Sequence, residues 1–267
     1  MSNLTILSVA YKPRIELVDR LIENFASKYP ILIINNSLEK LNDDLYHRKN
    51  VEIIDNELNL GNGAGINLGL KKIKTKYALY LDFDSFIDTE NFRKLDNYVK
   101  KLKDFAVLIP NSTGKKQYTE PYKTWKSEGS IMLFNLEIIR DKILFDEKYF
   151  LYFEETDFFF NCLKKNLDVF FLPDVAILHS QGSSSVEDVK IENLRTWHYS
   201  WSQFYFYKKN FGTYYAYSKC FPFFFKDIIM LIAYTLTFKS KLFKFRFYRI
   251  SGFLNSLIGL RSWKRIK

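Results

Sequence analysis

Two carboxylates stand two positions apart at Asp82 and Asp84, directly after the apolar run from Tyr77 to Leu81. Side chains at positions i and i+2 of a strand point to the same side, so these carboxylates can converge just past the strand end. Carboxylate oxygens are preferred ligands of hard cations such as Mg²⁺ and Mn²⁺, and such a cation would neutralise a diphosphate. A surface turn is the alternative for an isolated pair, but the apolar strand before it favours a metal site.

A glycine-rich string, Asn59 to Gly69, follows the third apolar run. Gly61, Gly63 and Gly65 permit tight turns and close approach of the backbone, and the helix expected to open near Gly63 offers free N–H groups to a phosphate. A dinucleotide-binding loop is the competing interpretation. Such a loop follows the first strand of its fold, whereas this string follows the third and is rich in asparagine, which disfavours an oxidoreductase.

A third group of acids, Glu154, Glu155 and Asp157, follows the aromatic segment 145–153. Carboxylates among aromatic side chains lose hydration, which raises their affinity for protons and suits a general base acting on a hydroxyl group. The alternative is a structural role at a helix start, where acidic side chains interact favourably with the helix dipole.

A single histidine, His179, ends the apolar run that begins at Val175. A lone histidine is commonly structural. At a strand end, however, its imidazole is able to complete a metal site with Asp84.

The elements that must position these groups alternate between β-rich apolar runs and amphipathic stretches, a pattern typical of a mainly parallel α/β sheet with crossover helices. Thr89 is expected to cap a helix that runs to about Lys103. In such sheets ligands bind beyond the carboxyl ends of the strands, so the polar residues after each strand are candidate binding residues. The expected strands are 4–9, 31–34, 51–54, 77–81, 106–109, 131–134 and 169–172, and the expected helices begin near residues 15, 63, 89 and 154.

The bulk composition bounds the class of protein. A chain of 267 residues that is 47% hydrophobic is large enough for one α/β domain with an appendage. Its two cysteines, Cys162 and Cys220, indicate neither a disulfide framework nor a zinc ribbon. The first residues lack the pattern of a secretory signal, so we expect a cytoplasmic protein.

Taken in order, the four clusters resemble the family-two inverting glycosyltransferases with the GT-A fold, a Rossmann-like, mainly parallel sheet flanked by helices, and especially their rhamnosyltransferase-like bacterial members. The resemblance covers about residues 4 to 212. It rests on the residues Asn59-x-Gly61-x-x-x-Gly65-x-Asn67-x-Gly69, Leu81-Asp82-x-Asp84-Ser85, Phe145-Asp146-Glu147, Glu154-Glu155-Thr156-Asp157 and His179.

The resemblance implies a role for each matching position. Asp84 would ligate Mg²⁺ or Mn²⁺, Asp82 would contact the ribose, order the loop or join the metal ligands, and His179 would assist at the diphosphate or metal. Glu155 stands at the position of the catalytic base, with Glu154 and Asp157 as alternatives. The donor nucleotide would be contacted by Ala10, Tyr11, Asn35, Asn36, Asn59, Gly61, Gly65, Asn67 and Asp82.

Three positions depart from the family pattern. Tyr11-Lys12 replaces the usual Tyr-Asn, and Glu155 replaces the usual Asp. Asn35 stands where an Asp usually accepts a hydrogen bond from a uracil or thymine ring, which leaves the choice of nucleobase open.

The resemblance also implies substrates. The donor would be dTDP-rhamnose or a UDP-sugar, and the acceptor a lipid-linked glycan, in the synthesis of bacterial surface polysaccharide such as lipopolysaccharide or capsule. A catalytically silent sugar-nucleotide-binding or scaffold protein of the same fold is the main alternative. A nucleotidyltransferase would need a glycine-rich loop after the first strand, which the segment 10–14 lacks.

The C-terminal region, residues 206–267, is expected to form amphipathic helices outside a catalytic domain of residues 1–205. From Lys219 onward it has eleven basic residues against one acid, Asp227, which accounts for the whole formal charge of +10. The longest uncharged stretch, Ile228 to Phe238, is too short for a membrane span of about 20 residues. Interleaved aromatic and basic residues instead predict peripheral binding to an anionic membrane, at its inner face.

Two alternatives for this region stay open. One is a helical hairpin that packs on the catalytic domain or forms a homo-oligomer. The other is binding of single-stranded nucleic acid, for which aromatic and basic residues are also suited. Residues 1–218 carry no net charge, so a nucleic-acid affinity of the main domain is not supported.

Overall fold

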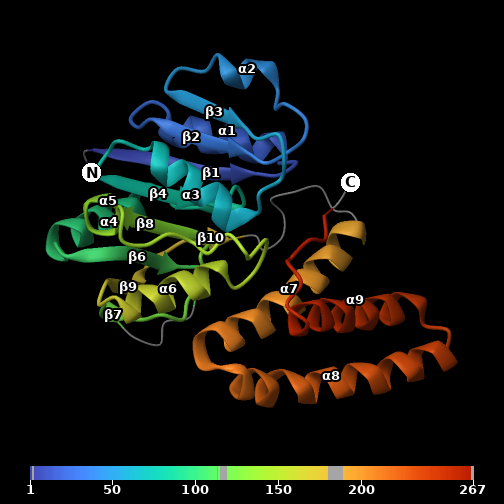
Figure 1. Ribbon diagram of the computed structural model, residues 1–267. Helices are drawn as coiled ribbons and strands as arrows, with labels where there is room; N and C mark the ends of the chain where they lie inside the picture. The colour runs from blue at the N-terminus through green and yellow to red at the C-terminus, as the bar shows by residue number, and fades with distance from the viewer. Residues whose placement is uncertain (2, 113, 115–118, 180–188, 266–267) are drawn as a thin grey trace. The chain divides into compact units, whose positions relative to one another are not determined.

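The computed structural model describes residues 1, 3–112, 114, 119–179 and 189–265 (Figure 1). The chain divides into two compact units. The first, the sheet unit, comprises Met1–Asp146 and Glu155–Val186, and the second, the helical unit, comprises Glu147–Glu154 and Glu187–Lys267. The expected domain boundary at residue 205 falls inside a helix of the helical unit, Val189–Phe211, and the division into separately folding domains stays a prediction.

The sheet unit is built around a sheet that has eight strands among the described residues, in the order β3-β2-β1-β4-β8-β6-β9-β7. Its strands are β1 Leu4–Ala10, β2 Ile31–Asn35, β3 Val51–Asp55, β4 Tyr77–Leu81, β6 Phe105–Asn111, β7 Tyr122–Lys123, β8 Ile131–Asn135 and β9 Asp168–Ala176. A short second sheet pairs β5 Ser85–Phe86 with β10 Leu178–His179. The helices are α1 Ile15–Phe25, α2 Asp43–Tyr46, α3 Asn62–Lys72, α4 Thr89–Lys101, α5 Leu136–Ile139 and α6 Glu154–Lys164.

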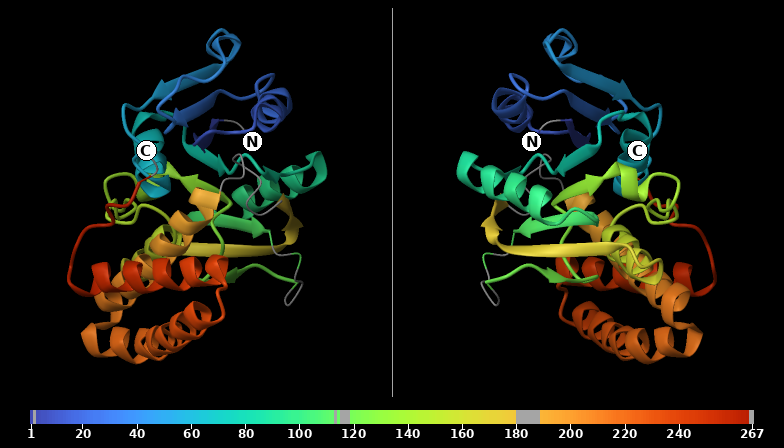
Figure 2. Two further views of the ribbon diagram at one scale, coloured as in Figure 1. Left: turned by 90° about the vertical axis from the view of Figure 1, so that its right-hand side faces the viewer. Right: turned by 90° about the vertical axis from the view of Figure 1, so that its left-hand side faces the viewer.

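Helices cover both faces of the main sheet. Alternate residues of each central strand enter two separate cores: in β4, Leu79 faces the core that contains α1 and α4, while Tyr80 faces the core of α3, α5 and α6. Figure 2 shows α1 and α4 on one side of the sheet and α3 on the other. Because both faces are buried, the strands read as nearly continuous apolar runs, which is why they were predictable.

The sheet is mainly parallel, as expected, but one central strand is reversed. β1 pairs in parallel with β2 and β4, whereas β8 lies antiparallel between β4 and β6. Leu81 therefore lies opposite Ile131, and the N–H of Asp82 donates to the carbonyl of Ser130 at 2.9 Å. The reversed strand brings the start of β8 to the carboxyl end of β4.

Two glycines of α3 allow this helix to lie directly on β1. A Cβ atom added to Gly65 would come within 2.8 Å of a methyl carbon of Val9, and one added to Gly69 within 2.3 Å of Leu7. Gly65 and Gly69 are one helical turn apart and so face β1 together. We expected the glycine string to serve phosphate binding, and the structure shows that these two members serve packing.

The start of α4 corrects one expected cap. Thr89 is the first helical residue, and Asp88 is the N-cap, whose Oδ1 accepts the N–H of Asn91 at 2.8 Å. Both residue types cap helices, and the cap lies one position before the predicted Thr89. The helix ends at Lys101.

The helical unit consists of α7 Val189–Phe211, α8 Thr213–Leu236 and α9 Ser240–Leu257, with α8 and α9 running side by side (Figure 1). Gly252 lies against α7, where an added Cβ would come within 2.2 Å of the carbonyl oxygen of Trp197. Between α8 and α9 the buried carboxylate of Asp227 accepts from Arg246 at 2.5 Å and pairs with Arg249 at 2.9 Å. Among the described residues, no helix is both long and apolar enough to span a bilayer.

The C-terminal segment after α9 is held by a buried histidine. The Nε2 of His198 lies 2.8 Å from the carbonyl oxygen of Lys264, and its Nδ1 lies 2.8 Å from Ser262 Oγ. Burial lowers the pKa of His198 to about 3, so its imidazole is neutral at physiological pH. This histidine therefore acts as a structural hydrogen-bonding group within the helical unit.

Gly69→Ala is expected to destabilise the protein by about 1–3 kcal/mol, because the new methyl group would overlap Leu7 at the contact between α3 and β1. The free energy of unfolding, measured with urea, checks this. Lys72→Ala, at the exposed end of the same helix, is the control and should change stability by less than about 0.5 kcal/mol. A Gly69→Ala protein as stable as the wild type would show that the close packing is not required.

Candidate functional site

The carboxyl ends of four parallel strands form one row. Ala10 lies opposite Asn35 and Asn35 opposite Asp55, while β4 pairs with the other side of β1. The row therefore runs from Asp55 past Asn35 and Ala10 to the acids that follow β4. Most of the residues predicted to bind a ligand lie along this row, beyond the carboxyl ends of the strands, where ligands bind in open α/β sheets.

The acid and histidine predicted to share a metal site do meet. The Asp84 side chain is only 3% exposed, and its Oδ1 lies 3.4 Å from Nδ1 of His179. The same nitrogen lies 2.9 Å from Ser85 Oγ. Pairing of β10 with β5 makes this contact, since it places His179 opposite Ser85.

Asp82 is held by its neighbours in the sheet. Its Oδ1 forms a short hydrogen bond with the hydroxyl of Tyr80, and that hydroxyl lies 3.0 Å from Oδ1 of Asn62. Tyr80 thus connects the carboxylate of Asp82 to the start of α3, the helix that follows the glycine string.

The donor set fits a hard divalent cation. No group of three or more His, Cys, Asp or Glu side chains within the described residues is arranged to enclose a metal ion on its own. Mg²⁺ commonly takes only one or two carboxylates from the protein and completes its shell with water and substrate phosphates. A buried carboxylate at Asp84, an adjacent imidazole at His179 and the nearby Asp82 suit Mg²⁺ or Mn²⁺ bound together with a diphosphate.

The three candidate bases differ in exposure. Asp157 is fully buried and its Oδ2 accepts from Asn161 at 2.9 Å, and Glu154 is only 4% exposed. Glu155 is partly exposed and packs on Gly129, where an added Cβ would come within 2.8 Å of Glu155 Cβ. Gly129 directly precedes Ser130, whose carbonyl accepts the N–H of Asp82 at the end of β4. The contact with Gly129 therefore places Glu155 beside the end of β4. Glu155 is therefore the most accessible of the three carboxylates.

The glycine string is shaped by asparagine side chains. Asn59 Oδ1 accepts the N–H of Gly61 at 3.0 Å, and Asn36 donates to the carbonyl of Gly61 at 3.0 Å. Gly61 has a φ of 88°, a conformation that favours glycine, and α3 begins at the next residue. The string thus presents the N-terminus of α3 at the row of strand ends, as an anion site requires.

Two other predicted nucleotide contacts are engaged in packing. Gly65 lies against Val9, and the amide of Asn67 exchanges two hydrogen bonds of 2.9 Å with the backbone of Phe145. Asn67 therefore fixes the segment that leads towards α6. A role for either residue at the nucleotide stays a prediction.

The segment after β1 is anchored by its backbone. The carbonyl of Ala10 accepts the N–H of Asn36 at 2.7 Å, and the N–H of Lys12 donates to Ser37 Oγ at 2.8 Å. Lys12 has a φ of 46°, a left-handed conformation that asparagine tolerates better than lysine. Its departure from the family pattern therefore has a cost in backbone strain, while Tyr11 beside it is partly exposed.

Asn35 does not present its amide to the site edge. It is fully buried, and its Nδ2 donates to Asp55 Oδ1 at 2.7 Å and to the carbonyl of Glu39 at 3.0 Å. Its Oδ1 accepts the N–H of Ser37 at 3.0 Å. Asp55, which was not among the predicted site residues, ends the neighbouring strand β3 opposite Asn35.

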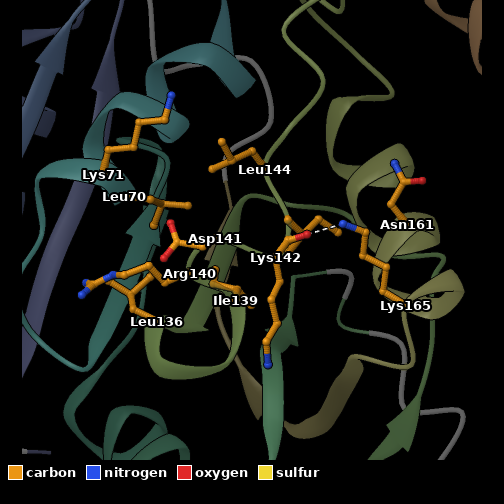
Figure 3. A pocket seen from close by; sticks show the side chains of 11 residues that line it. Leu70, Lys71, Leu136, Ile139, Arg140, Asp141, Lys142, Leu144, Asn161 and Lys165 are labelled. Carbon is orange, nitrogen blue, oxygen red and sulfur yellow. Dashed lines mark hydrogen bonds between the residues drawn. The ribbon is translucent and has the colours of Figure 1, made fainter.

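A cavity of about 460 Å³ lies elsewhere, near the amino end of β4 (Figure 3). Leu70, Leu136 and Ile139 supply apolar walls, and Lys71 and Arg140 are among its charged groups. The N–H of Leu136 bonds to the carbonyl of Lys76, just before β4, so this cavity lies at the amino end of that strand. It is separate from the carboxyl-end row that holds the predicted site.

Comparison with known proteins agrees with this geometry. The dTDP-rhamnosyl transferase RfbF of Shigella flexneri is 25% identical over 212 residues, which cover 70% of this chain and 72% of that protein. Mannosyltransferase PcManGT from Pyrobaculum calidifontis, solved with GDP-Man and Mn²⁺, shares the fold with a TM-score of 0.58 and 11% identity, over 96% of this chain and 87% of that one.

GalNAc-T7, solved with UDP, GalNAc and Mn²⁺, shares the fold with a TM-score of 0.56 and 15% identity over 66% of this chain. This chain spans only 43% of that longer protein. Residues 15–168, more than half of the chain, match the family model described as glycosyl transferase family 2. The fold, the arrangement of acids at the strand ends and this match together show that the chain belongs to glycosyl transferase family 2 and is a glycosyltransferase.

Proposed function

We propose that the protein transfers a sugar from a nucleoside diphosphate to a glycan acceptor with inversion at the anomeric carbon. The observation that carries this proposal is the contact of the buried Asp84 with His179 at the row of strand ends, with Glu155 on the neighbouring side. The donor is dTDP-rhamnose or a UDP-sugar. The similarity to a dTDP-rhamnosyl transferase supports the first, and a neighbour of the same fold that holds UDP supports the second.

The proposed donor site uses this chain's own charges in two places. Asp84, Asp82 and His179 would hold Mg²⁺ or Mn²⁺, which when bound offsets the negative charge of the departing diphosphate. The N-terminus of α3, after Gly61, offers backbone N–H groups to the same phosphates.

Glu155 is the proposed general base. Its carboxylate would take the proton of the acceptor hydroxyl as that oxygen bonds to the anomeric carbon and the bond to the diphosphate breaks. Because attack and departure occur on opposite faces, the configuration inverts. Most of the rate gain then comes from fixed placement of the reacting groups and from charge stabilisation.

The acceptor is proposed to be lipid-linked, and the helical unit to bind an anionic membrane. Phe225, Ile229, Ile232 and Leu236 form one stripe on α8, spaced by four, three and four residues, and are 55%, 66%, 58% and 74% exposed. Lys226, Lys239 and Lys241 are exposed nearby. An exposed apolar stripe bordered by cations is typical of helices that lie in the membrane interface.

The membrane proposal differs in detail from the sequence-based expectation. Arg246 and Arg249 are among the basic residues from which membrane binding was predicted, but both form ion pairs with the buried Asp227. Their charges are therefore partly neutralised inside the helical unit. Lys226 and Lys239 supply the remaining attraction to anionic lipid, while Lys241 lies 3.9 Å from the carboxylate of Glu192 in α7.

The donor site predicts metal-dependent nucleotide binding. Purified protein should bind UDP or dTDP in calorimetry with Mn²⁺ and bind it much more weakly without metal. Asp84→Asn should raise the dissociation constant about tenfold or more in Mn²⁺, because it removes one charge from the metal ligands. Asp104→Asn is the control, because it removes the same charge from an exposed residue just before β6. Absence of binding to either nucleotide would contradict the proposed donor site.

Removal of the proposed base should affect turnover but not donor binding. Glu155→Gln is expected to lower kcat about 10²–10⁴-fold, measured as nucleoside diphosphate release with acceptor glycan, while UDP or dTDP affinity is kept. Gly129→Ala should also lower kcat, because its methyl group would displace Glu155. Exposed Glu120→Gln should behave as wild type. Full activity of Glu155→Gln would assign the base to another residue.

The stripe on α8 predicts membrane binding that depends on its apolar side chains. The full-length double variant Ile229→Glu/Ile232→Glu should lose co-sedimentation with liposomes that contain anionic lipid, since two charges would enter the interface. Leu38→Glu/Leu163→Glu changes leucines of the sheet unit that are 67% and 53% exposed and should keep binding. Equal sedimentation of both double variants would contradict the proposal.

A further inference from the structure

The site geometry sets the direction in which a nucleotide must lie. Asp84 follows β4, and Glu155 lies on the β8 side of that strand through its contact with Gly129. The acceptor and the transferred sugar therefore belong on the β8 side. A nucleoside attached to phosphates at β4 extends the other way, across β1 towards β2 and β3.

The end of β3 is within reach of the nucleobase. Three strand spacings separate β4 from β3, which amounts to about 14 Å at about 4.8 Å per strand. The register places Asp55 opposite Asn35 and Asn35 opposite Ala10, so these strand ends lie level with one another. The base of a bound nucleotide therefore meets the side chains at the ends of β2 and β3.

One carboxylate at this place is held in a fixed orientation. Asp55 Oδ1 accepts from Nδ2 of Asn35 at 2.7 Å and from the hydroxyl of Tyr46 at 2.8 Å. Burial and the hydrogen bond to Asp55 raise the pKa of Tyr46 above its ordinary value, so Tyr46 keeps its proton and remains a donor. Both donors bind the same oxygen.

The other oxygen of Asp55 remains available to a ligand. Within residues 1, 3–112, 114, 119–179 and 189–265, no hydrogen bond or ion pair to Asp55 Oδ2 is formed, and the residue is exposed. Asn35, by contrast, has its carbonyl oxygen occupied by Ser37 and both amide hydrogens directed at protein acceptors. Of these two neighbours, Asp55 is the one that can accept a hydrogen bond from a ligand.

We propose that Asp55 reads the nucleobase and selects one with a ring N–H, which in the proposed donors is uracil or thymine. An ionised carboxylate only accepts hydrogen bonds. Uracil and thymine carry a hydrogen on the ring nitrogen N3, whereas cytosine has a lone pair there. A carboxylate aimed at that lone pair is left without its hydrogen bond, which discriminates strongly between the two. This inference rests on the proposed function, because it assumes a nucleotide at the row of strand ends.

The test is a change of base preference. In full-length protein with Mn²⁺, calorimetry should show that UDP and dTDP bind at least about tenfold more tightly than CDP. Asp55→Asn keeps an oxygen for Asn35 and Tyr46 but puts an NH₂ donor where the free oxygen was. The ratio of CDP to UDP dissociation constants should then fall about tenfold or more. Because loss of one negative charge favours every anionic nucleotide alike, the ratio isolates the effect on the base.

Controls separate this inference from its alternatives. Glu52→Gln removes the same charge at an exposed position of β3 and should leave the ratio unchanged. Asp55→Ala should also lower the ratio, and it serves if Asp55→Asn does not fold. If Asp55 bound the ribose instead, its variants would weaken UDP and CDP equally, which would overturn the proposal, as would an unchanged preference for UDP.

The same titrations distinguish failure of the proposed function. If wild-type protein binds UDP or dTDP and loses this binding in Asp84→Asn, the donor site stands whatever Asp55 does. If wild-type protein binds neither nucleotide, the proposed function fails and the role of Asp55 fails with it.

Discussion

The parallel pairing of β1 with β2 on one side and β4 on the other is the constraint on which the site depends. It brings strand ends that are far apart in sequence into one level row, since Ala10, Asn35 and Asp55 are in register. Both faces of these strands are buried under helices, so the polar side chains that could bind a ligand lie at and beyond the strand ends. Close packing of α3 at Gly65 and Gly69 keeps the glycine string at the same edge.

Polar groups at a buried edge must find partners, and this requirement explains much of the site's architecture. Asn56 donates to Asn36 at 2.7 Å, and Asn36 donates to Gly61, which links β3, β2 and the glycine string. Asp55 and Asn35 form a second link between β3 and β2. These hydrogen bonds position the side chains before any ligand binds, and such preorganisation lowers the cost of ordering the site on binding.

The sequence predicted the strands and the acidic clusters, because apolar runs and carboxylates are local signals. It did not predict long-range pairings: the reversal of β8, the β5–β10 pair that brings His179 to Ser85, or the packing role of Gly69. Nor does composition reveal which charges are internal, as Arg246 shows by its pairing with Asp227. Nor did the sequence predict the hydrogen bond between Asn35 and Asp55, which joins side chains of two adjacent strands.

The two departures at Lys12 and Asn35 have different physical meanings. Lys12 keeps a left-handed backbone, with its N–H bonded to Ser37, so the loop conformation survives a less suitable side chain at a cost in strain. Asn35 leaves the end of β2 without a carboxylate. Asp55 on the adjacent strand supplies one, and its Oδ1 lies 2.7 Å from Nδ2 of Asn35. The ends of these strands therefore still carry one carboxylate. A comparison of position 35 alone with the family pattern would suggest that this carboxylate is missing. Spatial neighbours, rather than aligned positions, decide what a strand-end site can recognise.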